Sequence, residues 1–150
     1  MTDLYVLLVF DGNYLFIPQD EVESVEIIAD VQMTPTDMGA VGWFFGHDLE
    51  SPVFCLAKDL SLSSNVPKNH EYLVLLKTEQ EPLGITGEEV ENINFKRDFI
   101  YPQELPAAMK TPDLPIRQLL VYQEKISYVC GGAALVKHLK ILSESLIQSV

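Results

Sequence analysis

Basic residues are scarce in this chain. It has 10 lysines and arginines against 22 acidic residues, which gives a formal net charge of −12 over 150 residues. Contacts to phosphate supply most of the affinity of proteins for nucleic acids, so an acidic chain without a basic cluster is a poor nucleic-acid binder. An anionic membrane surface is disfavoured for the same reason. We therefore expect no nucleic-acid partner, while a basic protein partner is compatible with this charge but not demanded by it.

Long apolar runs and export signals are also missing. The first apolar run, residues 4–10, has no positively charged segment before it, and Asp11-Gly12 follows where a cleavage site would lie. No run approaches the roughly 20 apolar residues of a membrane helix. The two cysteines, Cys55 and Cys130, lie in apolar strand-like runs, which indicates reduced core thiols. We expect a cytoplasmic protein that does not insert into membranes.

The side chains that carry catalysis or bind metals are few and scattered. The three histidines fall in a predicted turn, a predicted linker and the polar side of a predicted helix, at His47, His70 and His138. No two of them have the spacing of metal ligands, and Gly131-Gly132 lacks the spaced glycines and the lysine of a phosphate loop. We therefore expect no enzyme, no catalytic residue, no cofactor and no metal site.

Two pairs of adjacent acids also carry no chemistry by themselves. Neighbours along a strand point to opposite sides, so the carboxylates of Asp20-Glu21, like those of Glu88-Glu89, cannot act together. We interpret both pairs as solvated surface.

The sequence contains an internal repeat. The segment 17–25 reappears as 85–93, and each residue lies 68 positions after its counterpart, as with Ile17 and Ile85 or Val22 and Val90. Each copy follows an apolar strand-like run and a turn. A repeat at one fixed offset indicates a fold built from two similar halves. Two copies are too few for a solenoid, so they favour a duplicated subdomain.

Short strands dominate the predicted elements. The chain reads as eight to ten short strands with turn signals between them, and Asp11-Gly12 is a strong hairpin signal. One helix is predicted from Ala133 onward, where leucines recur at helical spacing at Leu135, Leu139, Leu142 and Leu146. We predict an all-β fold of two intertwined five-stranded barrels of the SH3 type, from a duplicated unit, plus the C-terminal helix, with residues 1–150 forming one domain.

Three successive aromatic residues indicate a surface. Because a strand alternates its faces, Trp43 and Phe45 should point away from the side that Phe44 occupies. At least one large aromatic side chain then lies near solvent, where aromatic residues are enriched in interface hot spots. The alternative is that both faces are buried.

The order of these segments resembles the CheW family of chemotaxis adaptors and the CheW-like regulatory domain of the histidine kinase CheA. Residues 10–18, followed by Val22 and Val25, resemble the opening of the family. Residues 40–46, then Pro52-Val53 and Asp59-Leu60, lie where the family has its Asn-Leu-Arg-Gly and Pro-Val-x-Asp-Leu segments. Residues 83–93 resemble a later segment centred on valine. The resemblance covers essentially the whole chain and implies the two-barrel fold.

The resemblance implies a non-catalytic adaptor that couples a chemoreceptor to a CheA-type histidine kinase or serves a pilus-type chemosensory system. It places the partner-binding residues on the barrel edge, at Trp43, Phe45, Gly46, Pro52 and Val53. The family's Asn-x-Arg-Gly reads Trp43-Phe44-Phe45-Gly46 here, without the arginine, so the chain resembles a diverged relative.

Two other interpretations remain open from the residues. A ligand-binding or catalytic barrel would bring Cys55, His47 and Asp48 together at its mouth, with Cys55 as a nucleophile. A self-associating module would instead use the leucine seam of the terminal helix, which a Leu139→Glu substitution would disrupt.

Overall fold

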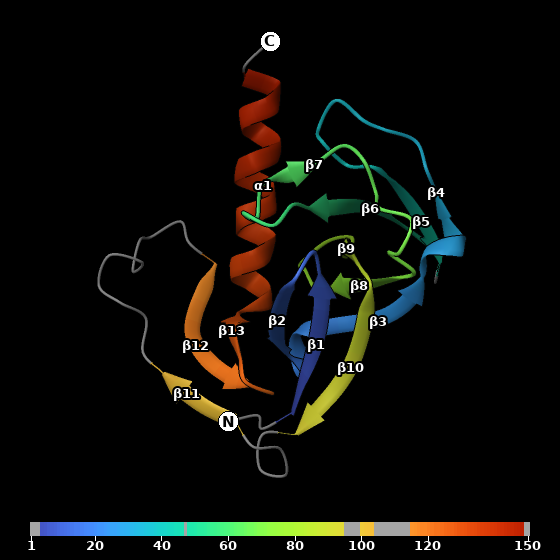
Figure 1. Cartoon of the computed structure of the whole chain (residues 1–150). Coiled ribbons are helices and arrows are strands. Elements are labelled where there is room, and N and C mark those ends of the chain that lie inside the picture. The colour runs from blue at the N-terminus through green and yellow to red at the C-terminus, as the bar shows by residue number, and fades with distance from the viewer. Residues whose placement is uncertain (1–3, 47, 95–99, 104–114, 149–150) are drawn as a thin grey trace.

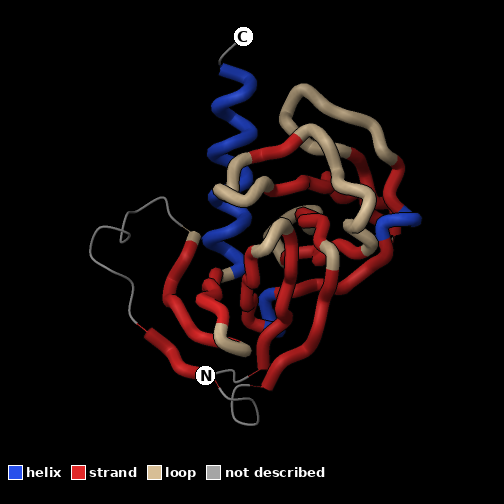
Figure 2. The backbone as a smooth tube through the Cα atoms, viewed as in Figure 1, coloured by secondary structure: helices blue, strands red, loops and turns tan. Residues whose placement is uncertain are grey.

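Two β-sheets and one long helix make up the described part of the chain (Figure 1). In this computed structural model, the structure describes residues 4–46, 48–94, 100–103 and 115–148. Strand accounts for most of this part of the chain, and the other regular elements are α1 (Gly132–Gln148) and two short 3-10 turns, η1 (Gln19–Glu21) and η2 (Ile28–Asp30) (Figure 2).

The first sheet, sheet A, has six strands in the order β10-β1-β2-β13-β12-β11. In chain order these are β1 (Leu4–Phe10), β2 (Asn13–Pro18), β10 (Glu89–Asn94), β11 (Ile100–Gln103), β12 (Ile116–Tyr122) and β13 (Lys125–Cys130). Neighbouring strands are antiparallel except for β2 and β13, which run parallel.

The second sheet, sheet B, has the order β3-β8-β9-β6-β5-β4, with β7 paired to β6 beside this path. In chain order these are β3 (Val22–Ile27), β4 (Val31–Gln32), β5 (Gly42–Gly46), β6 (Leu49–Leu56), β7 (Leu62–Ser63), β8 (Tyr72–Leu76) and β9 (Leu83–Gly87). Again one neighbouring pair is parallel, β6 with β9.

The two sheets have the same plan. Strands whose numbers differ by seven correspond to each other, so that β10 corresponds to β3, β1 to β8 and β2 to β9. When each strand of sheet A is replaced by its counterpart, the order of sheet B results. The parallel pair lies at the same position in both sheets. Both sheets also combine strands from the two halves of the chain: β1 and β2 pair with strands of the second half in sheet A, and β8 and β9 pair with strands of the first half in sheet B. The two halves are therefore intertwined, because neither sheet is complete without a strand from the other half.

The registers follow the 68-residue offset that the sequence predicts. Val6 pairs with Ile17 across the first hairpin, and their counterparts Val74 and Ile85 pair across the second. The same holds for β3 and β10 near their start, where Val22 pairs with Leu76 and Val90 pairs with Leu8. Beyond that point the strands differ, because β3 has a register irregularity between Val22 and Ser24.

Three groups of buried residues fill the interior. The largest contains matching residues of both hairpins, such as Leu8 with Leu76 and Ile17 with Ile85, together with Leu135 and Leu139 of α1. A second group lies against sheet A and a third against sheet B. The central group thus joins the two halves and the helix. Its burial supplies the main stabilisation, at about 25 cal/mol per Å² of apolar surface.

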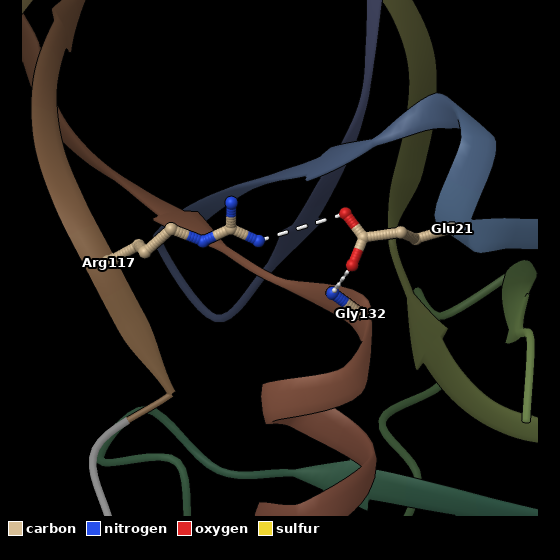
Figure 3. A network of polar contacts seen from close by, with 3 residues as sticks. All are labelled: Glu21, Arg117 and Gly132. Atoms are coloured by element: carbon tan, nitrogen blue, oxygen red, sulfur yellow. Dashed lines mark hydrogen bonds and ion pairs between the residues drawn. The ribbon is translucent and has the colours of Figure 1, made fainter. Parts of the chain in front are cut away.

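The start of α1 is fastened by a residue far away in the sequence (Figure 3). The first amide of the helix, on Gly132, donates to Glu21 Oε1 at 3.0 Å, and Arg117 Nη2 lies 3.7 Å from Glu21 Oε2. A Cβ on Gly132 would lie 2.8 Å from the Cβ of Glu21, and one on Gly131 would overlap the Arg117 guanidinium. Glycine is needed at position 132 because the helix start lies directly against η1, whereas at position 131 the long Arg117 side chain could move aside. The interpretation of Asp20-Glu21 as plain solvated surface is therefore wrong for Glu21.

The predicted fold class is confirmed: the chain is mainly β, with two curled sheets and a C-terminal helix. The short strands β4, β7 and β11 raise the number of strands per sheet above the expected five. Residues 58–60 form a turn that leads into β7. Four prolines lie between positions 102 and 115, and most of this stretch is outside the described residues. The first of them, Pro102, lies in the edge strand β11, where a missing N–H is tolerated.

Candidate partner-binding surface

The β5–β6 hairpin presents aromatic side chains to solvent. Phe44 is 4% exposed and packs in the group under sheet B, whereas Phe45 is 50% exposed and Trp43 is half-buried. The register pairs Trp43 with Pro52 and Phe45 with Glu50. Since directly paired residues lie on the same face of a sheet, these four residues form one outward patch, which we call the hairpin patch.

The hairpin lies near a sheet edge. The short strand β4 pairs with β5, placing Gln32 opposite Trp43, and β4 is the last strand of the sheet. Met33, which follows β4, is 49% exposed, and its backbone lies against Gly42. The exposed apolar surface at this edge therefore extends from the hairpin patch toward β4.

The structure separates the five predicted partner-binding residues into two groups. Four of them are at least partly exposed: Trp43, Phe45, Gly46 and Pro52. A Cβ on Gly46 would lie 2.5 Å from the Phe44 ring, so the glycine lets that ring pack against the backbone. Val53 is fully buried. It occupies the inward face of β6 beside Leu73 and Leu75, so it cannot offer its side chain to a partner. Binding by the other four residues stays a prediction.

The alternative site at Cys55 is not assembled by the described residues. His47 lies outside them, and Asp48 is in the exposed turn before β6, whereas Cys55 is near the far end of that strand. Seven residues of extended chain separate Asp48 from Cys55, or roughly 23 Å. The Cys55 thiol is fully buried and lies 3.7 Å from the carbonyl oxygen of Asn65. Burial raises the pKa of this thiol, so little thiolate is present at neutral pH.

A buried polar contact near Cys55 differs from the sequence prediction. His70, which the sequence predicts to lie in a linker, is 3% exposed, and its Nδ1 lies 2.9 Å from Thr86 Oγ1. Its Nε2 has no hydrogen-bond partner among the described residues. Burial lowers the pKa of His70, while the carboxylates of Glu88 and Asp11 act in the opposite direction. No histidine, cysteine and carboxylate cluster suited to a metal ion occurs in the described part of the chain.

The leucine seam of α1 belongs mainly to the core. Leu135 and Leu139 are fully buried in the central group, whereas Leu146 is 42% exposed. His138, expected on the polar side, is half-buried, and its Nε2 donates to the Leu60 carbonyl at 2.8 Å. A Leu139→Glu substitution would therefore disrupt folding rather than test self-association.

No protein-family model matches the sequence, and no curated protein sequence matches it. The structure, however, is similar to the crystal structure of the scaffolding protein TtCheW from Thermoanaerobacter tengcongensis. The TM-score is 0.65 at 14% sequence identity, and the match covers 87% of this chain and 89% of that one.

The fold is CheW-like. The similarity that the sequence suggested through the order of its segments is confirmed at the level of the fold, across nearly the full length of both chains. Within the described residues, none of the helices is long and apolar enough to cross a membrane.

Proposed function

We propose that the protein is a non-catalytic, cytoplasmic CheW-like adaptor that holds a CheA-type histidine kinase beside a chemoreceptor, or serves a pilus-type chemosensory system. The observation that carries the proposal is the CheW-like fold combined with an exposed aromatic patch, at the segment that resembles the family's partner-binding motif. The partners are proteins, with no nucleic acid and no inserted membrane segment.

The hairpin patch is the proposed kinase contact. Where the family has an arginine, this chain has Phe45, so the contact would rest on apolar burial in place of a charge-assisted hydrogen bond. Phe45 is half-exposed. If a partner covers the exposed half of its roughly 200 Å² of surface, about 100 Å² leaves water, which is worth about 2.5 kcal/mol. One side chain can therefore dominate the affinity of a modest interface.

An adaptor of this kind acts through binding alone. It changes the output of a kinase only if it contacts two kinase states with different affinities, since equal affinity shifts no equilibrium. The fully buried thiols and the distance between Asp48 and Cys55 give no support to the alternative of a cysteine-dependent catalytic barrel.

The test is a calorimetric titration of the folded protein with the regulatory domain of a CheA-type kinase encoded in the same genome. We expect saturable binding that Phe45→Ser weakens at least about tenfold, the fold-change that corresponds to 1.4 kcal/mol. The matched control is Ile126→Ser. Ile126 is 62% exposed on the β12–β13 hairpin, the counterpart of β5–β6 in the other sheet, and its loss should leave the affinity unchanged.

Two results would count against the proposal. One is the absence of binding at tens of micromolar while circular dichroism shows folded protein. The other is an equal loss of affinity in the Phe45 and Ile126 variants, which would place the contact away from the hairpin patch.

A further inference from the structure

A groove of about 660 Å³ lies between α1 and the turn that follows β8. One wall is the helix and the other is the segment 77–80, and the lining includes the apolar residues Ala133, Val136 and Ile141. Its volume is typical of pockets that bind ligands or side chains. The groove is therefore large enough to receive several side chains of another molecule.

Lysines concentrate in this groove. Lys77, Lys137 and Lys140 all line it, which is three of the ten basic residues of a chain with net charge −12. Glu79 and Glu144 also line it, so the balance of formal charge within the groove is positive. None of the three lysine side chains forms an ion pair with any described residue. Their charges are available to an acidic partner.

The two walls are joined at one end through Glu21. The backbone carbonyl of Glu21 accepts a hydrogen bond from the amide of Lys77 at 3.1 Å, and its carboxylate accepts one from the amide of Gly132 at 3.0 Å. One residue thus fixes the end of β8 and the start of α1, and Figure 3 shows its contact with the start of α1. A groove whose walls are held in place needs little reorganisation on binding, which lowers the entropic cost.

We propose that this groove binds an acidic amphipathic helix of a protein partner. The α1 wall extends from Ala133 to Glu144, roughly 16 Å or three helical turns, which suits a second helix lying alongside. Strand addition is not available at β8, which leads into the other wall, because both edges of β8 are already paired, with β3 and β9. Apolar side chains of the partner would contact Val136 and Ile141, and its carboxylates would lie near the lysines.

A second copy of this chain is a poor occupant by comparison. Each copy carries a charge of −12, and like net charge opposes association. At physiological ionic strength, charges more than about 8 Å apart are largely screened, so the lysines of the groove dominate the local attraction of a short acidic helix.

The groove is separate from the hairpin patch. In Figure 1, α1 lies on one side and strands β4 and β5 lie on the other, with the remaining strands of sheet B between them. The two surfaces can be occupied together. The groove proposal does not depend on the proposed adaptor function, because the two are tested with different ligands and different variants.

The test uses a hydrocarbon-stapled helical peptide of about four turns, with leucines on one face and glutamates on the other. Titration into the isotope-labelled full chain should shift the amide resonances of residues 77–80 and of α1. The same peptide with lysine in place of glutamate should bind at least about tenfold more weakly, a difference of 1.4 kcal/mol. Affinity for the acidic peptide should also fall as salt is raised.

The double variant Lys137→Glu/Lys140→Glu should weaken binding of the acidic peptide at least about tenfold. The matched control is Lys58→Glu/Lys68→Glu, which reverses the charge of two exposed lysines elsewhere and should leave the affinity unchanged. Equal binding of the two peptides, shifts confined to another surface, or no shift at millimolar peptide would overturn the proposal. Sedimentation should show a monomer. A dimer that the Lys137→Glu/Lys140→Glu variant abolishes would assign the groove to a second copy and would also overturn it.

Discussion

Replacing Glu21 by alanine tests the way in which α1 is attached to the sheets. The change removes the acceptor of the Gly132 amide, which lies at 3.0 Å at a buried helix start. Loss of a side-chain acceptor at a helix N-terminus costs about 0.5–2 kcal/mol. The Arg117 contact adds only a few tenths, because its atoms are 3.7 Å apart and the Arg117 side chain is 58% exposed. We therefore expect a loss of about 1–2 kcal/mol, or a fall in Tm of roughly 4 °C.

Urea unfolding followed by fluorescence measures this effect, since the chain has a single tryptophan, Trp43, in sheet B. Glu21→Gln keeps an oxygen acceptor and should lose about half as much stability as Glu21→Ala, while Arg117→Ala should lose less than about 0.5 kcal/mol. If Glu21→Ala and Arg117→Ala have equal effects, the ion pair and not the amide acceptor holds the helix. A Glu21→Ala effect below about 0.3 kcal/mol would refute the attachment altogether.

Three further outcomes follow from the strained and buried residues. Gln123 and Glu124 form a two-residue hairpin turn with φ of 52° and 64°, so Gln123→Asn/Glu124→Gly should raise the free energy of unfolding by about 1 kcal/mol; no gain would contradict this. Burial lowers the pKa of His70, so as the pH falls below 6.5 this histidine is protonated in the unfolded chain before it is protonated in the folded one. The free energy of unfolding should therefore fall toward pH 5. His70→Gln should flatten this pH profile, and an unchanged profile would show that His70 is not responsible. Burial raises the pKa of Cys55, and that of Cys130 to about 12, so iodoacetamide should label both slowly until urea is added; rapid native labelling of Cys55 would restore the thiol alternative.

The duplication within the fold could be predicted from the sequence because both copies of the repeat have the same spacing of apolar residues. The offset of 68 that relates Val22 to Val90 also relates the registers of the two hairpins. The apolar runs that end at Cys55 and at Cys130 are also similar, but aligning the two cysteines puts these runs one residue out of register. Val129 pairs with Phe16 as Val53 pairs with Gly84, so Cys130 corresponds to Phe54. The sequence alone allows Cys130 to be aligned with either Cys55 or Phe54. Only the alignment with Phe54 puts matching residues in the central core.

Residues whose role depends on distant partners could not be predicted. Nothing local distinguishes Glu21, which fastens a helix 111 positions later, from the exposed acids around it. His70 looked like a linker residue because it follows a polar turn, yet it packs against Thr86 on a neighbouring strand. Val53 was assigned to the surface through its place in a motif, although strand alternation puts it opposite to Pro52 and hence inside.

The most direct test of the adaptor proposal is the phosphorylation rate of a CheA-type kinase reconstituted with its chemoreceptor, with and without this protein. The proposal predicts that the chain changes this rate in a concentration-dependent manner, and that Phe45→Ser abolishes the change whereas Ile126→Ser does not. A rate that stays the same at saturating, folded protein would contradict it.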